Sequence, residues 1–459
     1  MELNVEYIFI LCILYINDIG DDLMNNHMDI PWHEYTNKDS KVKIENASLT
    51  EKSSVIGRIG LMLLACGTGA WRVRSSMNTI ASELNITCIA DIGLTNISYT
   101  CIDGIESHAQ SLSLHNTSVN TSKLARMEDF VYHFKDECKT CTCNEIHNQL
   151  DQIESIHSSY SPIILGLAAA LACSCFTFLL GGGPIEMLCA FVGAGLGNTL
   201  RMKLIKHNYT LFLNVAASVS LACLAYALLF NFLETCFGIA TQHEAGYICS
   251  MLFIIPGFPF ITSGIDLAKL DLRSGLERLA YAVIIILAAT LTAWICALVL
   301  HLQPVDFVKL HISTSTKLLL RLLTSFGGVF GFSIMFNSSK KIAASAGCIG
   351  AIANTLRLTL VDLSLPAAAA AFIGALTAGL LASMIKGNTG YPRIAITVPS
   401  IVIMVPGLYM YRAIYNLELA STVSIGANWL IQSLLIVLAL PMGLIFARIL
   451  TDPSFRYCT

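Results

Sequence analysis

Charged residues are scarce in this chain. Only 13% of its 459 residues are Asp, Glu, Lys or Arg, whereas soluble proteins carry about 25%. Hydrophobic residues make up 55%, and the mean hydropathy is +0.65. This composition is typical of a protein that lies mostly within a membrane. The net charge of −3 gives no reason to expect nucleic-acid binding, which relies on a marked excess of Lys and Arg.

Sequence motifs of the common enzyme chemistries are also missing. The chain has no G-x-x-x-x-G-K-[ST] loop, with which ATP-driven proteins bind the phosphates of the nucleotide. Neither G-x-S-x-G nor H-E-x-x-H occurs, and no G-x-G-x-x-G lies beside a predicted strand. We therefore assign no catalytic residue and no cofactor, and we expect any transport to draw on an ion, proton or substrate gradient.

Sixteen cysteines are present, but their placement does not suggest a disulfide framework. Seven of them lie in apolar runs, where cysteine behaves as a small hydrophobic residue: Cys173, Cys175, Cys189, Cys223, Cys249, Cys296 and Cys348. One dense cluster, Cys138, Cys141 and Cys143 with His147, has a spacing that could hold zinc. No second pair of ligands follows nearby, so we favour a reduced, cysteine-rich helix and assign no metal site.

Charge is distributed unevenly along the chain. Residues 1–160 carry a net charge of −10 and residues 161–459 one of +7, which indicates an acidic soluble part followed by a membrane part with basic loops. We divide the chain into a flexible tail, a soluble domain and two membrane halves, at residues 1–52, 53–160, 161–303 and 304–459. An apolar run in the tail is too short to span about 30 Å of hydrocarbon and lacks the flanks of a signal peptide.

The soluble domain has the pattern of a small α+β fold. Helical spacing of apolar residues occupies 53–84, with glycine interruptions, and returns over 124–156. Between them, two short β-rich segments at 86–92 and 94–102 predict a pair of strands separated by Gly93.

From residue 161 the sequence predicts an α-helical polytopic membrane protein. Ten apolar segments are each long enough to cross the bilayer, near residues 162–182, 185–204, 209–231, 246–264, 279–301, 317–336, 341–360, 365–385, 394–415 and 424–448. Lys and Arg are more frequent in the loops on the side of the soluble domain, which predicts that this domain and both termini are cytoplasmic. The expected partners are membrane lipids and a small-molecule substrate, not nucleic acid, and a homo-oligomer is left open.

The two membrane halves repeat each other. Asn-Thr-Leu-Arg occurs at 198–201 and again at 354–357, on the second span of each half. Pro-Gly interrupts the fourth span of each half, at Pro256-Gly257 and 150 residues later at Pro406-Gly407. Because five spans per half is an odd number, the second half would lie inverted relative to the first. Paired interrupted helices in an inverted repeat are typical of the binding sites of secondary transporters.

The two breaks and the polar residues in the spans form the predicted substrate site. Pro and Gly within an apolar span leave backbone N–H and C=O groups without helical partners. We expect the breaks to face each other across a central cavity, where these groups could bind the carboxylate and the ammonium of an amino acid. The candidate substrate-binding residues are Pro256, Gly257, Asn198, Thr199, Asn354, Thr355, Pro406, Gly407 and Tyr411. The alternatives are that the Pro-Gly pairs only kink helices and that Asn and Thr only join helices by hydrogen bonds.

A charged segment after the first break supplies the candidate gating or coupling residues. Asp266 and Asp271 could form a proton site, with Arg278 as a partner for either. Alternatively, the two carboxylates belong to the capped, solvated start of a cytoplasmic helix. We favour this second interpretation, because Lys269 and Arg273 lie beside both carboxylates and would keep them ionised.

Several of these motifs resemble the bacterial threonine/serine exporter family. Residues 60–73, GLMLLACGTGAWRV, are similar to its glycine-rich opening motif. The first break and the charged segment that follows it, Asp266, Asp271, Ser274-Gly275 and Arg278, resemble its first membrane half. The second half is matched by Val398-Pro399, Val405-Pro406-Gly407 and Tyr411. The resemblance implies a cytoplasmic N-terminal domain, ten or so spans in the bacterial inner membrane, and export of small hydrophilic metabolites, most of all threonine and serine.

Two other functions stay open at this point. Some relatives in the family are split into two subunits and are associated with dicarboxylate export, so the resemblance does not fix the substrate. The second alternative is a membrane enzyme or sensor, with chemistry in the soluble domain at Cys66, His108, His133 or the cysteine cluster. An exporter changes the accumulation of a metabolite in cells, whereas an enzyme turns over its substrate in detergent.

Overall fold

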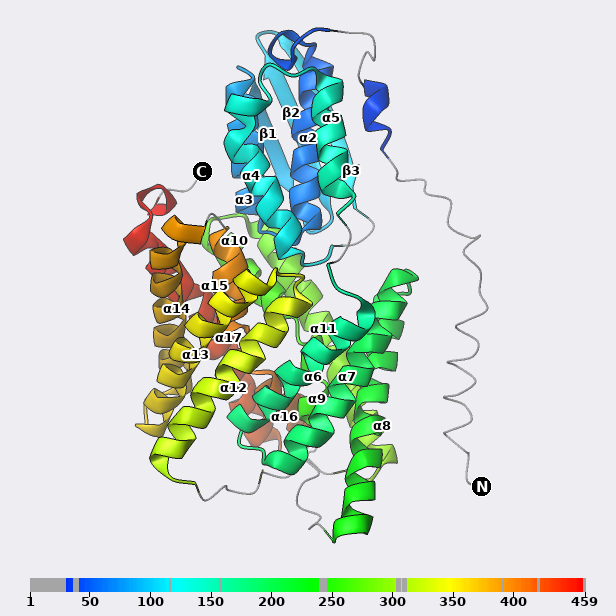
Figure 1. Cartoon of the computed structure of the whole chain (residues 1–459), viewed down its shortest axis with the longest axis vertical. Coiled ribbons are helices and arrows are strands. Elements are labelled where there is room, and N and C mark those ends of the chain that lie inside the picture. Colours follow the sequence, from blue (N-terminus) through cyan, green and yellow to red (C-terminus); the bar gives the residue numbers. More distant parts are fainter. Residues whose placement is uncertain are drawn as a thin grey trace.

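Figure 1 shows the computed structural model of the chain, in which a small α+β part stands on a bundle of long helices. The structure describes residues 30–35, 41–114, 117–156, 159–238, 246–302, 307, 312–389, 392–418 and 422–456. Most of the expected tail, including its apolar run, lies outside these residues.

The helices of the α+β part are α2 (Leu49–Ala65), α3 (Ala70–Glu83), α4 (Thr121–Glu137) and α5 (Cys143–Glu154). Helix α2 begins at Leu49, a few residues before the expected domain boundary, because Ser48 and Glu51 form a capping box that satisfies its first N–H groups. Ile44, still further upstream, is fully buried. The folded α+β part therefore includes residues that the sequence assigned to the tail.

The sheet of this part is antiparallel, in the order β1-β2-β3. Strands β1 (Thr87–Ile92) and β2 (Asn96–Asp103) correspond to the predicted pair, whereas β3 (Glu106–Ser113) is a further strand that the sequence analysis missed. Its sequence, ESHAQSLS, is polar because β3 is an edge strand of which only Leu112 is buried. The Asp103-Gly104 pair before it, a strong hairpin signal, could have revealed it.

The side chains of the cysteine cluster have separate partners. The thiol of Cys138 donates to Gln149 Oε1 at 3.3 Å, and the thiol of Cys143 donates to the carbonyl of Glu51 at 3.6 Å. Burial raises the pKa of both thiols to about 12. Within the described ranges, no three His, Cys, Asp or Glu side chains are placed to hold a metal ion together.

The bundle below the α+β part consists of α6 (Pro162–Leu179), α7 (Pro184–Lys206), α8 (Leu211–Phe237), α9 (Gly246–Ser250), α10 (Gly257–Ala268), α11 (Leu272–Val299), α12 (Thr314–Met335), α13 (Lys340–Asp362), α14 (Ala367–Thr389), α15 (Arg393–Val402), α16 (Gly407–Glu418) and α17 (Val423–Thr451). In the part of the chain that the structure describes, seven of these helices are each long and apolar enough to cross a membrane: α6, α8, α11, α12, α13, α14 and α17. The segments on either side of each Pro-Gly pair form two more candidates, bent by 56° and 49°. This gives seven to nine candidate spans. Helix α7, which corresponds to the predicted segment 185–204, is not among them; it is long but carries Asn198 and Arg201.

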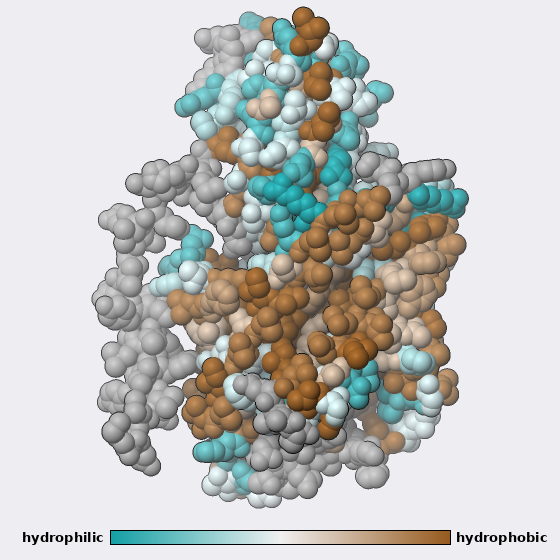
Figure 2. Space-filling model, turned by 180° about the vertical axis from the view of Figure 1, so that it is seen from behind, coloured by the Kyte–Doolittle hydropathy of each residue, from teal (hydrophilic) through white to brown (hydrophobic). Residues whose placement is uncertain are grey.

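The surface of the bundle is apolar. Figure 2 shows, on one face of the molecule, a broad band of hydrophobic residues over the helices and mostly hydrophilic residues on the α+β part. On α11, for example, Leu291, Ile295 and Leu298 are about half exposed. So large an exposed apolar surface is rare in soluble monomers and is what lipid contact requires. The prediction of a multi-pass membrane protein is confirmed.

Helix contacts in the second half of the bundle follow those in the first. Helix α7 packs on α6 and α8, and α13 packs on α12 and α14. Helix α8 packs on α11 in the first half, as α14 packs on α17 in the second. Between the halves, α6 contacts α12, α10 contacts α17 and α16 contacts α11. The half-helix after each break therefore packs on the last helix of the opposite half.

The buried His147 of α5 gives the α+β part a stability that depends on pH. Burial, and secondarily the nearby Arg58 guanidinium, lowers the pKa of His147 to about 3, from an ordinary 6.5. Between these two pKa values, His147 is therefore neutral in the folded chain and protonated in the unfolded chain. We expect full stability above about pH 6.5 and a loss of up to about 1.4 kcal/mol per pH unit between there and about pH 3. Hydrogen-exchange protection of α2, corrected for intrinsic rates, should fall accordingly from pH 7 to pH 5.

His147→Gln should flatten this pH dependence. A glutamine amide does not titrate, yet it can replace the contacts of the ring with Ser54 and Arg58. His133→Gln is the matched control, because His133 lies partly exposed on α4. If the variant at His147 and the wild type lose protection equally, the pH dependence belongs to other groups.

Candidate functional site

The two breaks share one backbone geometry. At the first, the N–H of Gly257 donates to the carbonyl of Ile255 at 2.8 Å; at the second, the N–H of Gly407 donates to the carbonyl of Val405 at 2.9 Å. In both, the next helix then begins with a bond to the proline carbonyl. Each break is a tight turn closed by a hydrogen bond between residue i and residue i+2. The turn bends the span without reversing the direction of the chain. The breaks predicted from Pro-Gly are therefore real and match each other.

The two breaks lie directly against each other. A Cβ atom added to Gly257 would come within 3.1 Å of Val402, and one added to Gly407 would come within 2.5 Å of Ile255. Each glycine thus faces residues of the opposite break. The sequence suggested a cavity at this point, whereas in this conformation apolar side chains fill the contact.

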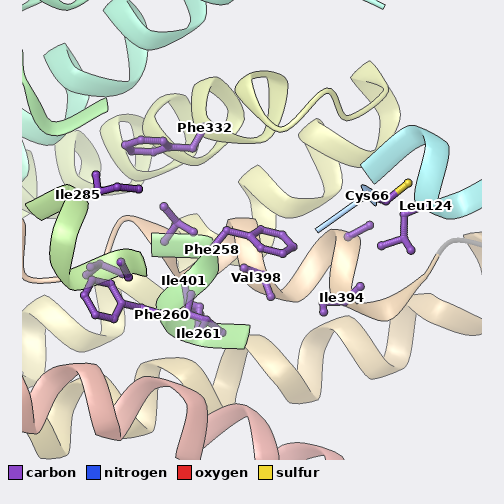
Figure 3. Close-up of a cluster of buried hydrophobic side chains, with 14 of the residues drawn as sticks. Cys66, Leu124, Phe258, Phe260, Ile261, Ile285, Phe332, Ile394, Val398 and Ile401 are labelled. Atoms are coloured by element: carbon purple, nitrogen blue, oxygen red, sulfur yellow. The ribbon is translucent and has the colours of Figure 1, made fainter. Parts of the chain in front are cut away.

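The contact between the broken spans continues on both sides of the breaks. Toward the α+β part, Phe258 of α10 lies beside Val398 and Ile401 of α15 (Figure 3). Toward the far end, Tyr247 of α9 and Tyr411 of α16 are fully buried, and a 2.7 Å hydrogen bond joins their hydroxyls. The outer half-helices of the two broken spans are therefore tied together on the side away from the α+β part.

The asparagines of the repeated motif join neighbouring helices. Asn198 Nδ2 of α7 donates to the carbonyl of Leu165 in α6 at 2.8 Å. Asn354 Nδ2 of α13 donates to Ser325 Oγ in α12 at 2.9 Å. Both asparagines therefore act here as interhelical hydrogen-bond donors, one in each half and at the corresponding helix pair.

The remaining residues of the motif have different surroundings. Thr199 Oγ1 donates to the carbonyl of Gly195 in its own helix at 2.7 Å, and the buried hydroxyl of Thr355 has no hydrogen-bond partner among the described residues. Arg201 Nη1 donates to the carbonyl of Phe253, in the turn just before the first break, at 3.3 Å. The sequence analysis did not select Arg201, although it ends the repeated Asn-Thr-Leu-Arg motif.

A buried ion pair fastens the α+β part to the bundle. Asp266 of α10 is fully buried, and its Oδ2 lies 3.2 Å from Nε of Arg278 in α11. The same oxygen accepts a hydrogen bond from the N–H of Ala70, at the start of α3, at 3.2 Å. Arg278 donates in turn to the carbonyls of Gly67 and Thr68, at 3.3 and 2.7 Å. The glycine-rich motif between α2 and α3 therefore rests on this pair.

Two glycines allow this close approach. Gly67 has φ of +79°, a backbone conformation that favours glycine. A Cβ atom on Gly69 would lie 2.5 Å from Asp266 Oδ1. A side chain at Gly69 would therefore displace either the carboxylate or α3.

The favoured interpretation of Asp266 and Asp271 as a solvated helix start is wrong. Asp266 is fully buried, and the side chain of Asp271 is only 4% exposed and forms an ion pair with Arg74 of α3. Local sequence could not show this, because the covering surface comes from the α+β part, about 200 residues earlier in the chain.

A pocket lies beside the ion pair, between the α+β part and the bundle. Its empty volume is ≈ 560 Å³, open solvent included. The walls come from α10 and α15, the halves of the two broken spans nearest the α+β part, and from α14 and α17. The start of α3 and the C-terminal turn η6 (Pro453–Arg456) complete it. Its lining includes Trp71, Arg72, Asp266, Arg393, Arg448 and Phe455.

The residues proposed for enzyme chemistry lie on different elements. Cys66 follows α2, His108 belongs to β3 and His133 to α4. Burial raises the pKa of Cys66 to about 12, which removes the thiolate that a nucleophile would need.

Two family models match the chain. One, described as a threonine/serine exporter, matches residues 54–300, more than half of the chain. The other, described as Threonine/Serine exporter, ThrE, matches residues 321–450. The first therefore covers the α+β part with the helices up to α11, and the second covers most of the remaining helices.

Two curated relatives are similar to the chain. A Mycobacterium tuberculosis protein named "Probable threonine/serine exporter" is 22% identical over 418 residues, which cover 87% of this chain and 76% of that protein. An "Uncharacterized protein" of Haemophilus influenzae is 26% identical over 168 residues, which cover 33% of this chain and 56% of that protein. No solved structure matches.

Arg278→Gln should loosen the α+β part from the bundle. The change leaves Asp266 buried without its ion-pair partner, and breaking a buried pair from one side costs about 3–5 kcal/mol. We expect faster hydrogen exchange at Ala70 and along the first turn of α3, measured on the full chain in detergent. Arg273→Gln is the control: Arg273 is exposed and pairs with exposed carboxylates, an interaction of about 0–1 kcal/mol. Equal exchange in the two variants would argue against the fastening role of the buried pair.

Proposed function

Since this chain belongs to the threonine/serine exporter family, we propose that it is a secondary transporter that exports small hydrophilic metabolites, chiefly amino acids such as threonine and serine. The family is one of transporters, so the enzyme alternative falls away. The observation that carries the proposal is the direct contact of two broken helices with matching backbone turns. Broken helices that meet between two repeats are where secondary transporters bind substrate.

We propose that the membrane part is an inverted repeat of five plus five spans. The order of helix contacts is the same in both halves, and α7 counts as a span because it packs between α6 and α8. The first broken span runs toward the α+β part and the second runs away from it, as inversion requires (Figure 1). The asparagines that join corresponding helix pairs add further support.

We propose that the α+β part and both termini are cytoplasmic, in a bacterial inner membrane. A contact near the C-terminus supports the same side of the membrane for the C-terminal segment and the α+β part: Phe455 of η6 packs on Trp71 of α3, with ring centroids 5.3 Å apart. The excess of Lys and Arg in the loops at this end of the bundle supports the cytoplasmic side for it. Membrane lipids would then contact the apolar band between the two ends (Figure 2).

Export would proceed by alternating opening around the breaks. In this conformation the tyrosine pair ties the outer half-helices together, whereas the pocket lies at the end nearest the α+β part. A substrate would enter from that end and pass when Pro256-Gly257 separates from Pro406-Gly407. Separation would expose backbone N–H and C=O groups of the half-helix ends, which carry about half an elementary charge. Release on the far side would require Tyr411 to leave its partner. Asn198 and Asn354 of the repeated motifs would hold the neighbouring helices together during this change.

Gly257→Leu and Gly407→Leu should abolish export. At both positions an added Cβ atom would already crowd the opposite break. A leucine side chain would therefore force the two spans apart and prevent them from returning to this contact. The measurement is efflux of labelled threonine from loaded cells, with and without an uncoupler that collapses the proton gradient.

The matched control is Cys348→Leu, which adds a similar side chain to an exposed position of α13. All three variants should reach the membrane in equal amounts. Normal efflux from both well-folded glycine variants would show that the breaks serve packing alone and that substrate passes elsewhere.

A reporter fused after residue 459 should be active only in the cytoplasm. A second fusion in the turn between α13 and α14, at the opposite end of the bundle, should be active only outside (Figure 1). An outside signal from the C-terminal fusion contradicts the orientation proposed here.

A further inference from the structure

The pocket between the α+β part and the bundle is rich in arginine. Arg72, Arg393 and Arg448 line it from three different elements, α3, α15 and α17. Removing so many cations from water is unfavourable unless anions compensate them. The charges that face these three guanidinium groups therefore show what the pocket can accept.

Compensation of the three arginines is incomplete. Arg72 pairs with Glu128 of α4. Arg448 Nε lies 3.6 Å from Asp452, too far for a hydrogen bond. Arg393 forms no ion pair in the described part of the chain and instead donates to the hydroxyl of Thr451 and the carbonyl of Gly379. The pocket thus holds an excess of positive charge.

The arginine side chains are held in fixed positions. The guanidinium carbon of Arg448 lies 4.4 Å from the ring centroid of Trp71 and 4.3 Å from that of Phe455, distances typical of cation–π contact. The buried Nε atoms of Arg72 and Arg448 have no hydrogen-bond partner among the residues that the structure describes. Ordered donors without acceptors are what a bound carboxylate would satisfy.

One carboxylate oxygen in the same lining is also unused. Oδ2 of Asp266 accepts from Ala70, Ser274 and Arg278. Oδ1 of Asp266 is fully buried and has no hydrogen-bond partner among the described residues. Such an orphaned oxygen is rare in proteins and needs an explanation. A cationic donor in the pocket would provide it.

We propose that this pocket binds the substrate on the cytoplasmic side as a zwitterionic α-amino acid, its carboxylate on Arg393 and Arg448 and its ammonium on Asp266 Oδ1. This inference rests on the proposed export function and assigns a binding site to its substrate. A dicarboxylate fits less well, because its second carboxylate would meet Asp266. The soluble domain, through Trp71 and Arg72, forms part of the site and is more than a docking surface.

Ligand binding to the purified full chain in detergent tests the assignment without relying on transport. Titration calorimetry with L-threonine should give a measurable Kd for the wild type. Arg393→Gln should raise this Kd by about 10- to 100-fold, as expected for the loss of a hydrogen bond to a charged group. Arg393→Lys keeps the positive charge but loses the planar guanidinium group. Its Kd should therefore lie between those of the wild type and of Arg393→Gln. Arg321→Gln is the matched control, because Arg321 pairs with Asp362 at the opposite end of the bundle.

A ligand series tests the ammonium contact without disturbing Asp266. In the wild type, 3-hydroxybutanoate, which is threonine without its ammonium, and succinate should both bind at least about tenfold more weakly than L-threonine. Equal Kd values for Arg393→Gln and the wild type, or the absence of threonine binding to the wild type, overturn the pocket assignment. If succinate or 3-hydroxybutanoate binds as tightly as threonine, the assignment of a zwitterionic ligand is overturned.

Failure of the proposed export function is a separate result. It would appear as wild-type cells that release no labelled amino acid faster than cells without the chain. Normal threonine export with unchanged binding in Arg393→Gln would leave the function standing and remove this pocket from it.

Discussion

The buried pair of Asp266 and Arg278 is the contact on which the arrangement of this molecule depends. Two charges removed from water are stable only when their remaining polar atoms are also satisfied. Arg278 reaches this condition through backbone carbonyls of the glycine-rich motif. Oδ2 of Asp266 reaches it through Ser274 and the first N–H of α3, whereas Oδ1 has no partner among the described residues. Because Asp266 lies in the last turn of the half-helix that begins at the first break, the ion pair also fixes that half-helix relative to the α+β part. One interaction therefore positions the docking motif, one pocket wall and one broken span.

The breaks follow from a different constraint, the demand for backbone hydrogen bonds in an apolar environment. A span that contains Pro and Gly must satisfy its freed groups inside the protein. Both breaks do so with a short turn in which a glycine N–H bonds two residues back. They then cover this turn with the apolar side chains of the opposite break. Each break thus shields the other, which explains why they occur as a pair.

Local sequence predicted the features that depend on local chemistry. Proline removes a helical donor wherever it occurs, so the breaks at Pro256 and Pro406 could be placed to the residue. Strand β3 was missed because an exposed edge strand has few apolar residues. The burial of Asp266 was missed because its cover comes from a distant segment. Arg393 and Arg448 were not among the candidate site residues, because nothing in the local sequence brings α15 and α17 to one pocket.

The pocket also has a consequence for how such a chain can be divided. The first family model ends at residue 300, just after α11, and the second begins at residue 321, within α12. The pocket draws its lining from both sides of this gap. A gene cut there would yield one subunit with Trp71, Arg72 and Asp266 and another with Arg393 and Arg448. Neither subunit alone would hold a complete set of charges. If the pocket binds substrate as proposed, the two subunits would be needed together.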